Sequence, residues 1–84
     1  MNIQDLLSSL EKLIAELKKT GKYQSALFFI DRYNSIKGNV INYDAVKELS
    51  TCRAMAQYGD FTYKEEELLN GVVNNAIAVI KSNP

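Results

Sequence analysis

The chain has 84 residues, 46% of them hydrophobic, which is enough for one globular domain and too apolar for a disordered chain. Its ten basic and ten acidic residues cancel, whereas nucleic-acid-binding proteins normally carry a basic excess. It has no histidine and one cysteine, which excludes Ser-His and Cys-His catalytic pairs, cysteine-histidine zinc sites and an internal disulfide.

The first predicted helix spans residues 2 to about 20. Its apolar residues recur at the i, i+3, i+4 and i+7 spacing of one helical face. They are Ile3, Leu6, Leu7, Leu10, Leu13, Ile14 and Leu17. Gly21 follows and offers the left-handed conformation that commonly ends a helix.

The second predicted helix spans about residues 22–37. At 100° per residue its expected core face holds Tyr23, Ala26, Leu27, Ile30 and Tyr33, extended by Phe29 and Ile36. Phe28 falls nearly opposite, among polar residues. Three interpretations of Phe28 stay open: it covers a neighbouring helix, it lies in a homodimer contact, or it anchors a foreign partner together with Arg32.

After a linker at 38–42, in which Val40 and Ile41 are expected to close one end of the core, a third helix is predicted over residues 43–58. Asn42 is a suitable N-cap for this helix. Its narrow apolar face holds Ala45, Leu49, Cys52 and Ala56, with Gly59 at its end. The small residues on this face favour a close approach to a neighbouring helix.

The fourth predicted helix spans residues 62–82 and opens with a capping box, in which Thr62 and Glu65 bond each other's backbone amides. Its apolar stripe holds Leu69, Val72, Val73, Ala76, Ile77 and Ile80. Four amphipathic helices with short connections predict a single all-α domain over 1–84. We expect a four-helix antiparallel bundle centred on the first and last helices. An orthogonal packing of two helical hairpins fits the patterns equally.

No group of residues in the sequence predicts catalysis, so we expect a non-enzymatic protein with no cofactor and no bound metal. The acidic run at Asp60, Glu65, Glu66 and Glu67 is better explained by the helix dipole than by a cation site. Cys52 is expected to be a buried structural thiol. The lone thiol and the absence of a long apolar run favour a cytoplasmic protein that binds neither membranes nor nucleic acid.

The stretch "CRAMAQYGDF" at 52–61, with the helix that follows it, resembles a group of small bacterial helical proteins, most of them uncharacterised. Some members of such groups look like immunity or antitoxin partners of bacterial toxins. The resemblance covers about the last third of the chain and implies a protein that binds another protein. It points to Met55, Tyr58, Asp60 and Phe61.

The sequence therefore predicts a small protein-binding module, in its concrete form an immunity or antitoxin-type inhibitor that occludes its partner. The expected partner-binding residues are Phe28, Arg32, Met55, Tyr58, Asp60, Phe61 and Tyr63. Tyr58 and Tyr63 flank a turn, and tyrosine is enriched at binding hot spots. Two alternatives remain: a homo-oligomeric structural domain joined through the second helix, or a small carrier of an apolar ligand.

Overall fold

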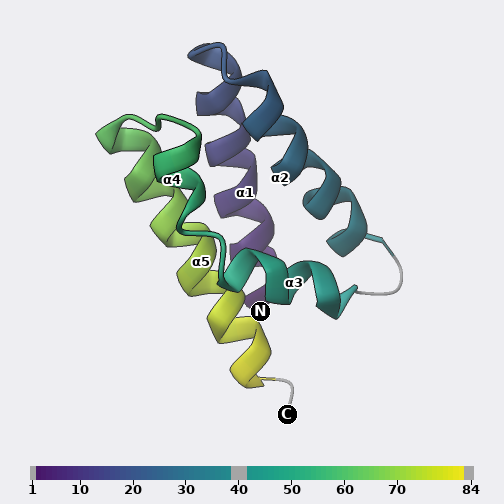
Figure 1. Ribbon diagram of the computed structural model, residues 1–84. Coiled ribbons are helices and arrows are strands. Elements are labelled where there is room, and N and C mark those ends of the chain that lie inside the picture. The colour runs from purple at the N-terminus through teal and green to yellow at the C-terminus, as the bar shows by residue number, and fades with distance from the viewer. Residues whose placement is uncertain (1, 39–41, 83–84) are drawn as a thin grey trace.

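The computed structural model describes residues 2–38 and 42–82, which contain five helices and no strand (Figure 1). The helices are α1 (Asn2–Lys19), α2 (Tyr23–Ile36), α3 (Tyr43–Ser50), α4 (Met55–Tyr58) and α5 (Tyr63–Ser82). The predicted all-α class is confirmed. The expected role of Val40 and Ile41 lies outside the described residues.

The two longest helices, α1 and α5, run antiparallel and make the largest contact in the molecule. The Asn75 amide of α5 donates to the Asp5 carbonyl near one end of α1, and Lys64 pairs with Glu16 near the other. Helix α2 packs against α1, and α3 lies across the long helices, in contact with α2 and α5 (Figure 1). The predicted four-helix antiparallel bundle is not confirmed, because the third predicted helix is broken and its first part crosses the others.

The core lies between α1 and α5 and is closed by α2 and α3. The α1 stripe supplies Leu6, Leu10, Leu13 and Leu17, each 0% exposed, and the α5 stripe supplies Leu69, Val72, Val73 and Ala76. Burying a leucine side chain contributes about 1.5–3 kcal/mol. The regular spacing predicted for the first and last helices therefore places the most stabilising residues at the centre of the fold.

The prediction of one continuous helix over 43–58 is wrong, because the chain leaves the helix at Thr51. The Ser50 hydroxyl donates to the Lys47 carbonyl at 2.6 Å, and the Thr51 hydroxyl lies 3.4 Å from the Lys47 and Glu48 carbonyls. The Cys52 thiol donates to the Leu49 carbonyl at 3.2 Å. Three successive side chains thus bond the last carbonyls of α3 and compete there with the backbone amides of a further helical turn.

The predicted core face of α2 also needs correction. Tyr23 and Leu27 are 63% and 62% exposed, whereas Ala26, Phe29 and Ile36 are buried. Helix α2 contacts α3 as well as α1. Packing on two sides turns the buried face toward Phe29, and it leaves the Tyr23–Leu27 edge in solvent.

Candidate protein-binding surface

The corner between α4 and α5 is a compact turn closed by backbone hydrogen bonds. The Phe61 N–H donates to the Ala56 carbonyl at 3.0 Å, and the Asp60 N–H donates to the Gln57 carbonyl at 3.4 Å. Asp60 has a φ of 53°, the left-handed conformation that this type of helix ending requires. The turn reverses the chain so that Tyr58 ends α4 and Tyr63 begins α5.

Phe61 anchors this corner to the core. Its ring is 8% exposed, and a Cβ added at Gly59 would lie 2.5 Å from the ring. Only glycine therefore fits at position 59. The expectation that Phe61 contacts a partner does not fit this burial, because its ring is already used to fix the turn.

The predicted capping box at the start of α5 is present. The Glu65 N–H donates to the Thr62 hydroxyl at 3.2 Å, and the Thr62 N–H donates to the Glu65 carboxylate at 2.8 Å. Glu65 is also 0% exposed. Its carboxylate accepts a hydrogen bond from the Thr20 hydroxyl and pairs with the Lys22 ammonium at 3.1 Å. Glu65 therefore joins the α4–α5 corner to the turn between α1 and α2.

The electrostatics of Glu65 follow from these partners. Burial acts to raise the pKa of its carboxyl, but the hydrogen bonds from Thr20, Thr62 and Lys22 and the charge of Lys22 outweigh it. The pKa lies below its ordinary value, and Glu65 is a buried anion. The acidic residues predicted to cluster here are thus divided, since Glu65 faces inward while Glu66 and Glu67 are exposed.

Three tyrosines are exposed on the α1–α2 turn side and on the α4–α5 corner, the two segments that Glu65 joins, and we call them the tyrosine surface. Tyr58 is 89%, Tyr63 78% and Tyr23 63% exposed. Tyr23 and Tyr58 line one shallow hollow of about 450 Å³. Tyr23 follows Lys22, and Tyr63 stands two residues before Glu65, so the Lys22–Glu65 ion pair holds their segments together.

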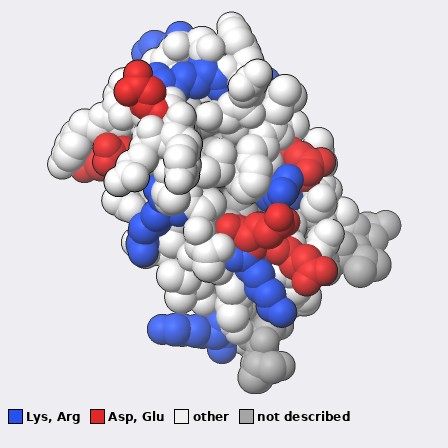
Figure 2. All heavy atoms as spheres, viewed as in Figure 1, with Lys and Arg blue, Asp and Glu red and all other residues white. Residues whose placement is uncertain are grey.

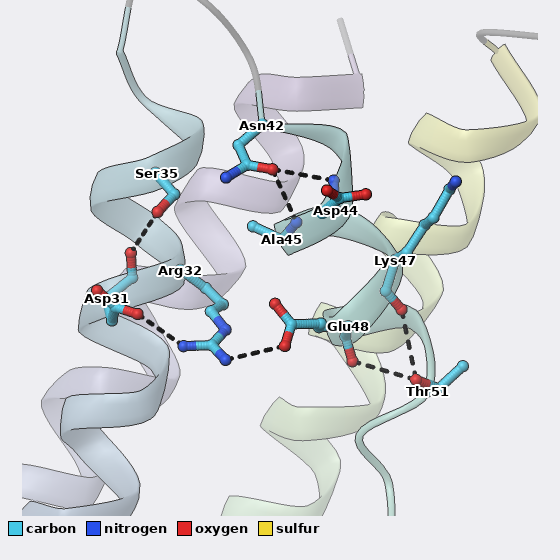
Figure 3. A network of polar contacts seen from close by, with 9 residues as sticks. All are labelled: Asp31, Arg32, Ser35, Asn42, Asp44, Ala45, Lys47, Glu48 and Thr51. Atoms are coloured by element: carbon cyan, nitrogen blue, oxygen red, sulfur yellow. Dashed lines mark hydrogen bonds and ion pairs between the residues drawn. The ribbon is translucent and has the colours of Figure 1, made fainter.

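The predicted residues Phe28 and Arg32 lie elsewhere, on α2. Figure 3 shows Arg32 where α2 meets α3. The Arg32 guanidinium pairs with Asp31 at 2.7 Å and with Glu48 of α3 at 3.0 Å. It also lies 4.1 Å from the centroid of the half-buried Phe28 ring, which packs against the core. This arrangement matches the first interpretation of Phe28, in which the ring covers the side of a neighbouring helix.

The structure thus separates the predicted binding residues. Tyr58, Asp60 and Tyr63 are exposed at one corner, whereas Met55 is half-buried against the core. Tyr23 belongs with the exposed group but was predicted on the core face. Its position in the first turn of α2, beside a glycine-containing turn, is the signal in the sequence that places it at the end of the molecule.

No chemical centre accompanies this surface in the part of the chain that the structure describes. No group of three or more acidic or cysteine side chains there could hold a metal ion. Burial raises the pKa of the Cys52 thiol to about 11, and the Arg53 and Arg32 charges lower it by less.

Charges of both signs are scattered over the face seen in Figure 2. None of the described helices has the length and apolar character needed to cross a membrane.

Comparison of the chain with protein-family models, with curated proteins and with solved structures gave no match. The function proposed below is therefore argued from the geometry of the surface.

Proposed function

We propose that this protein works by binding another protein through the tyrosine surface formed by Tyr23, Tyr58 and Tyr63. The observation that carries the proposal is their exposure, 63% to 89%, on segments that are fixed from inside the molecule. A tyrosine side chain offers a large contact area, a hydroxyl for hydrogen bonding and few rotatable bonds. Tyrosines are accordingly enriched among the residues that dominate binding energy.

The supports behind the surface favour binding because they limit the entropy lost on association. Phe61 anchors the corner, Asp60 and Gly59 shape it, and Glu65 ties it to the segment before Tyr23. A surface that is ordered before binding loses less conformational freedom when its partner arrives. A standard interface buries about 800 Å² on each partner. The three tyrosines would lie at its centre, and the surface around them would supply the remaining area.

The concrete form that we propose is an inhibitor of the immunity or antitoxin type in a bacterial cytoplasm. This form draws on the resemblance carried by "CRAMAQYGDF". Such an inhibitor acts by covering a working surface of its partner and needs no catalytic group of its own. The tyrosines supply the contact, and the helices behind them supply the rigidity.

The proposal is tested with tagged protein expressed in the source cells and recovered with its bound partners. Tyr58→Asp and Tyr63→Asp are compared with Tyr43→Asp, because Tyr43 is 38% exposed and belongs to α3. Circular dichroism confirms that each variant is folded. We expect one partner to be recovered with the wild type and the Tyr43 variant and to be lost from the other two.

A partner retained by both Tyr58→Asp and Tyr63→Asp would contradict a binding role for the tyrosine surface. The inhibitor form has its own test, in which the recovered partner is co-expressed with wild-type or variant protein. We expect the wild type to relieve growth inhibition by the partner and Tyr58→Asp to fail. A partner that does not inhibit growth would leave binding intact and overturn the inhibitor form.

A further inference from the structure

A second exposed surface lies between α1 and α2, on the edge of α2 that the core does not use. Leu27 is 62% exposed, and the groove beside it holds Ile14, Ala15 and the half-buried Ile30. The groove has a volume of about 450 Å³. Glu11 lines it on one side of Ile14 along α1, and Lys18 lines it on the other. The groove therefore has an apolar middle with the Glu11 carboxylate at one end and the Lys18 ammonium at the other. The Lys37 ammonium lies 5.3 Å from the Tyr33 ring at the Glu11 end.

We propose that a second copy of this chain covers the α1–α2 groove, related to the first by a two-fold axis through its middle. A two-fold axis brings the same patch of both copies together and reverses one relative to the other. The acidic end of each groove then meets the basic end of the other. Glu11 of one copy lies beside Lys18 of its partner, and the partner's Glu11 lies beside Lys18 of the first copy.

The spacing of these charges suits a reversed pairing. Glu11 and Lys18 are seven residues apart, which is about two turns and roughly 10 Å along the helix. They stand almost symmetrically about Ile14 and Ala15, so one axis matches both pairs. The helix dipole does not account for Glu11, because it acts only within the first turn of a helix, and Glu11 lies in the middle of α1.

The position of Glu11 is also fixed within each chain. The Tyr33 hydroxyl donates a hydrogen bond to the Glu11 carboxylate. This contact holds the charge at the end of the groove while leaving Glu11 exposed. The small side chain of Ala15 lets the backbone of a second helix approach the middle of the groove.

The dimensions and the apolar residues also fit a second copy. The molecule measures 35 Å by 20 Å along its two longer axes. Its long face is therefore large enough for a standard interface, which buries about 800 Å² on each partner. Pairing covers Leu27, which is the most exposed large aliphatic side chain in residues 3–38 and 42–82. Neither Tyr58 nor Tyr63 lines this groove, so the dimer leaves the α4–α5 corner open. Tyr23 shares the exposed edge of α2 with Leu27, so the dimer lies next to that one member of the tyrosine surface.

The test is the molar mass in solution, measured by sedimentation across a range of protein concentrations. We expect the wild type to reach twice its monomer mass of 9.5 kDa, and we expect Leu27→Asp to remain a monomer. Tyr43→Asp is the matched control, because it places the same charge on an exposed residue of α3 that does not line the groove. The proposal is overturned if the wild type is still a monomer at about 1 mM protein. At that concentration only a dimer with a binding free energy weaker than about 4 kcal/mol escapes detection.

The orientation is tested by reversing the charges. Glu11→Lys and Lys18→Glu should each weaken dimerisation about tenfold, because two attractive pairs become repulsive in each dimer. The double variant restores both pairs and should dimerise like the wild type. Glu66→Lys controls for charge reversal at an exposed site on α5. A double variant that dimerises no better than the two single variants overturns the reversed arrangement.

Discussion

The buried carboxylate of Glu65 gives the most demanding test of the structure. Replacing Glu65 with alanine leaves the Thr20 hydroxyl, the Thr62 amide and the Lys22 ammonium without their common acceptor. Removing one partner of a buried ion pair costs about 3–5 kcal/mol. Lys22 keeps 20% exposure, so water can reach its ammonium, and we expect a loss of about 3 kcal/mol.

This loss is large for a chain of this size, whose free energy of unfolding is roughly 4–12 kcal/mol. Glu65→Gln keeps the volume of the side chain and one carbonyl acceptor, so it should cost less, about 1.5 kcal/mol, for the charge-assisted bonds that it loses. Glu66→Gln is the matched control, because Glu66 is exposed on the same turn. It should change the free energy of unfolding by no more than about 0.5 kcal/mol.

Urea unfolding followed by circular dichroism measures these differences at pH 7. With a slope of about 1 kcal/mol per molar urea, Glu65→Ala should lower the midpoint by about 3 M. If Glu65→Ala and Glu65→Gln both unfold within about 0.5 kcal/mol of Glu66→Gln, the carboxylate does not join the two turns as described, and the reasoning is refuted.

The same variants predict how stability depends on pH. The folded-state pKa of Glu65 is lowered, so the unfolded chain binds the proton more readily. The contribution of Glu65 is fully present above the unfolded pKa, near 4.3, and is lost as the pH falls through the lower folded value. The difference between wild type and Glu65→Gln should be constant from pH 6 to 8 and should narrow below about pH 4.

Three further predictions concern the α4–α5 corner and the cysteine. Gly59→Ala should lower the free energy of unfolding by about 2 kcal/mol, since its Cβ would lie 2.5 Å from the Phe61 ring; a thermal melt equal to that of the wild type would contradict this packing. Asp60→Gly should raise the free energy of unfolding by about 0.5 kcal/mol, because glycine adopts the positive φ at this position without a steric penalty. A lower urea midpoint than that of the wild type would instead indicate that the aspartate side chain stabilises the turn. Cys52 has a buried thiol with a pKa of about 11, so in native protein a thiol reagent at pH 8 should react at least about 100-fold more slowly than with free cysteine, and equal rates would exclude its burial.

The elements that were predicted best are those whose signals are local. The first and last helices have regular apolar stripes, and the left-handed Gly21 and the capping box at Thr62 mark a boundary of each. These signals depend on residues within one or two turns of each other. They are therefore readable without knowledge of the tertiary packing.

The elements that were missed depend on side chains competing for the backbone or on distant neighbours. The side chains of Ser50, Thr51 and Cys52 bond the last carbonyls of α3 at the point where it ends. A periodicity argument counts only the apolar face and does not weigh this competition for the backbone. The burial of Glu65 depends on Thr20, which lies 45 residues away in sequence. No local pattern identifies that partner.

The tyrosine surface shows the same division. Tyr58 and Tyr63 were predicted to bind because they flank a turn, and both are exposed. The helical periodicity puts Tyr23 on the core face, because it carries no information about the packing of α3 against α2. The burial of Phe61 likewise follows from the ring packing against Gly59, which depends on the three-dimensional course of the turn.

The Lys22–Glu65 ion pair has a consequence for backbone motion. It connects the ends of two segments that are far apart in sequence, so neither the α1–α2 turn nor the start of α5 can open without disturbing the other. Amide hydrogen exchange at these two places should therefore respond together to a single substitution at Glu65, while the α2–α3 contact held by Arg32 keeps its own rate. The carboxylate of Glu65 therefore couples the opening of the turn before Tyr23 to the opening of the corner that carries Tyr58 and Tyr63.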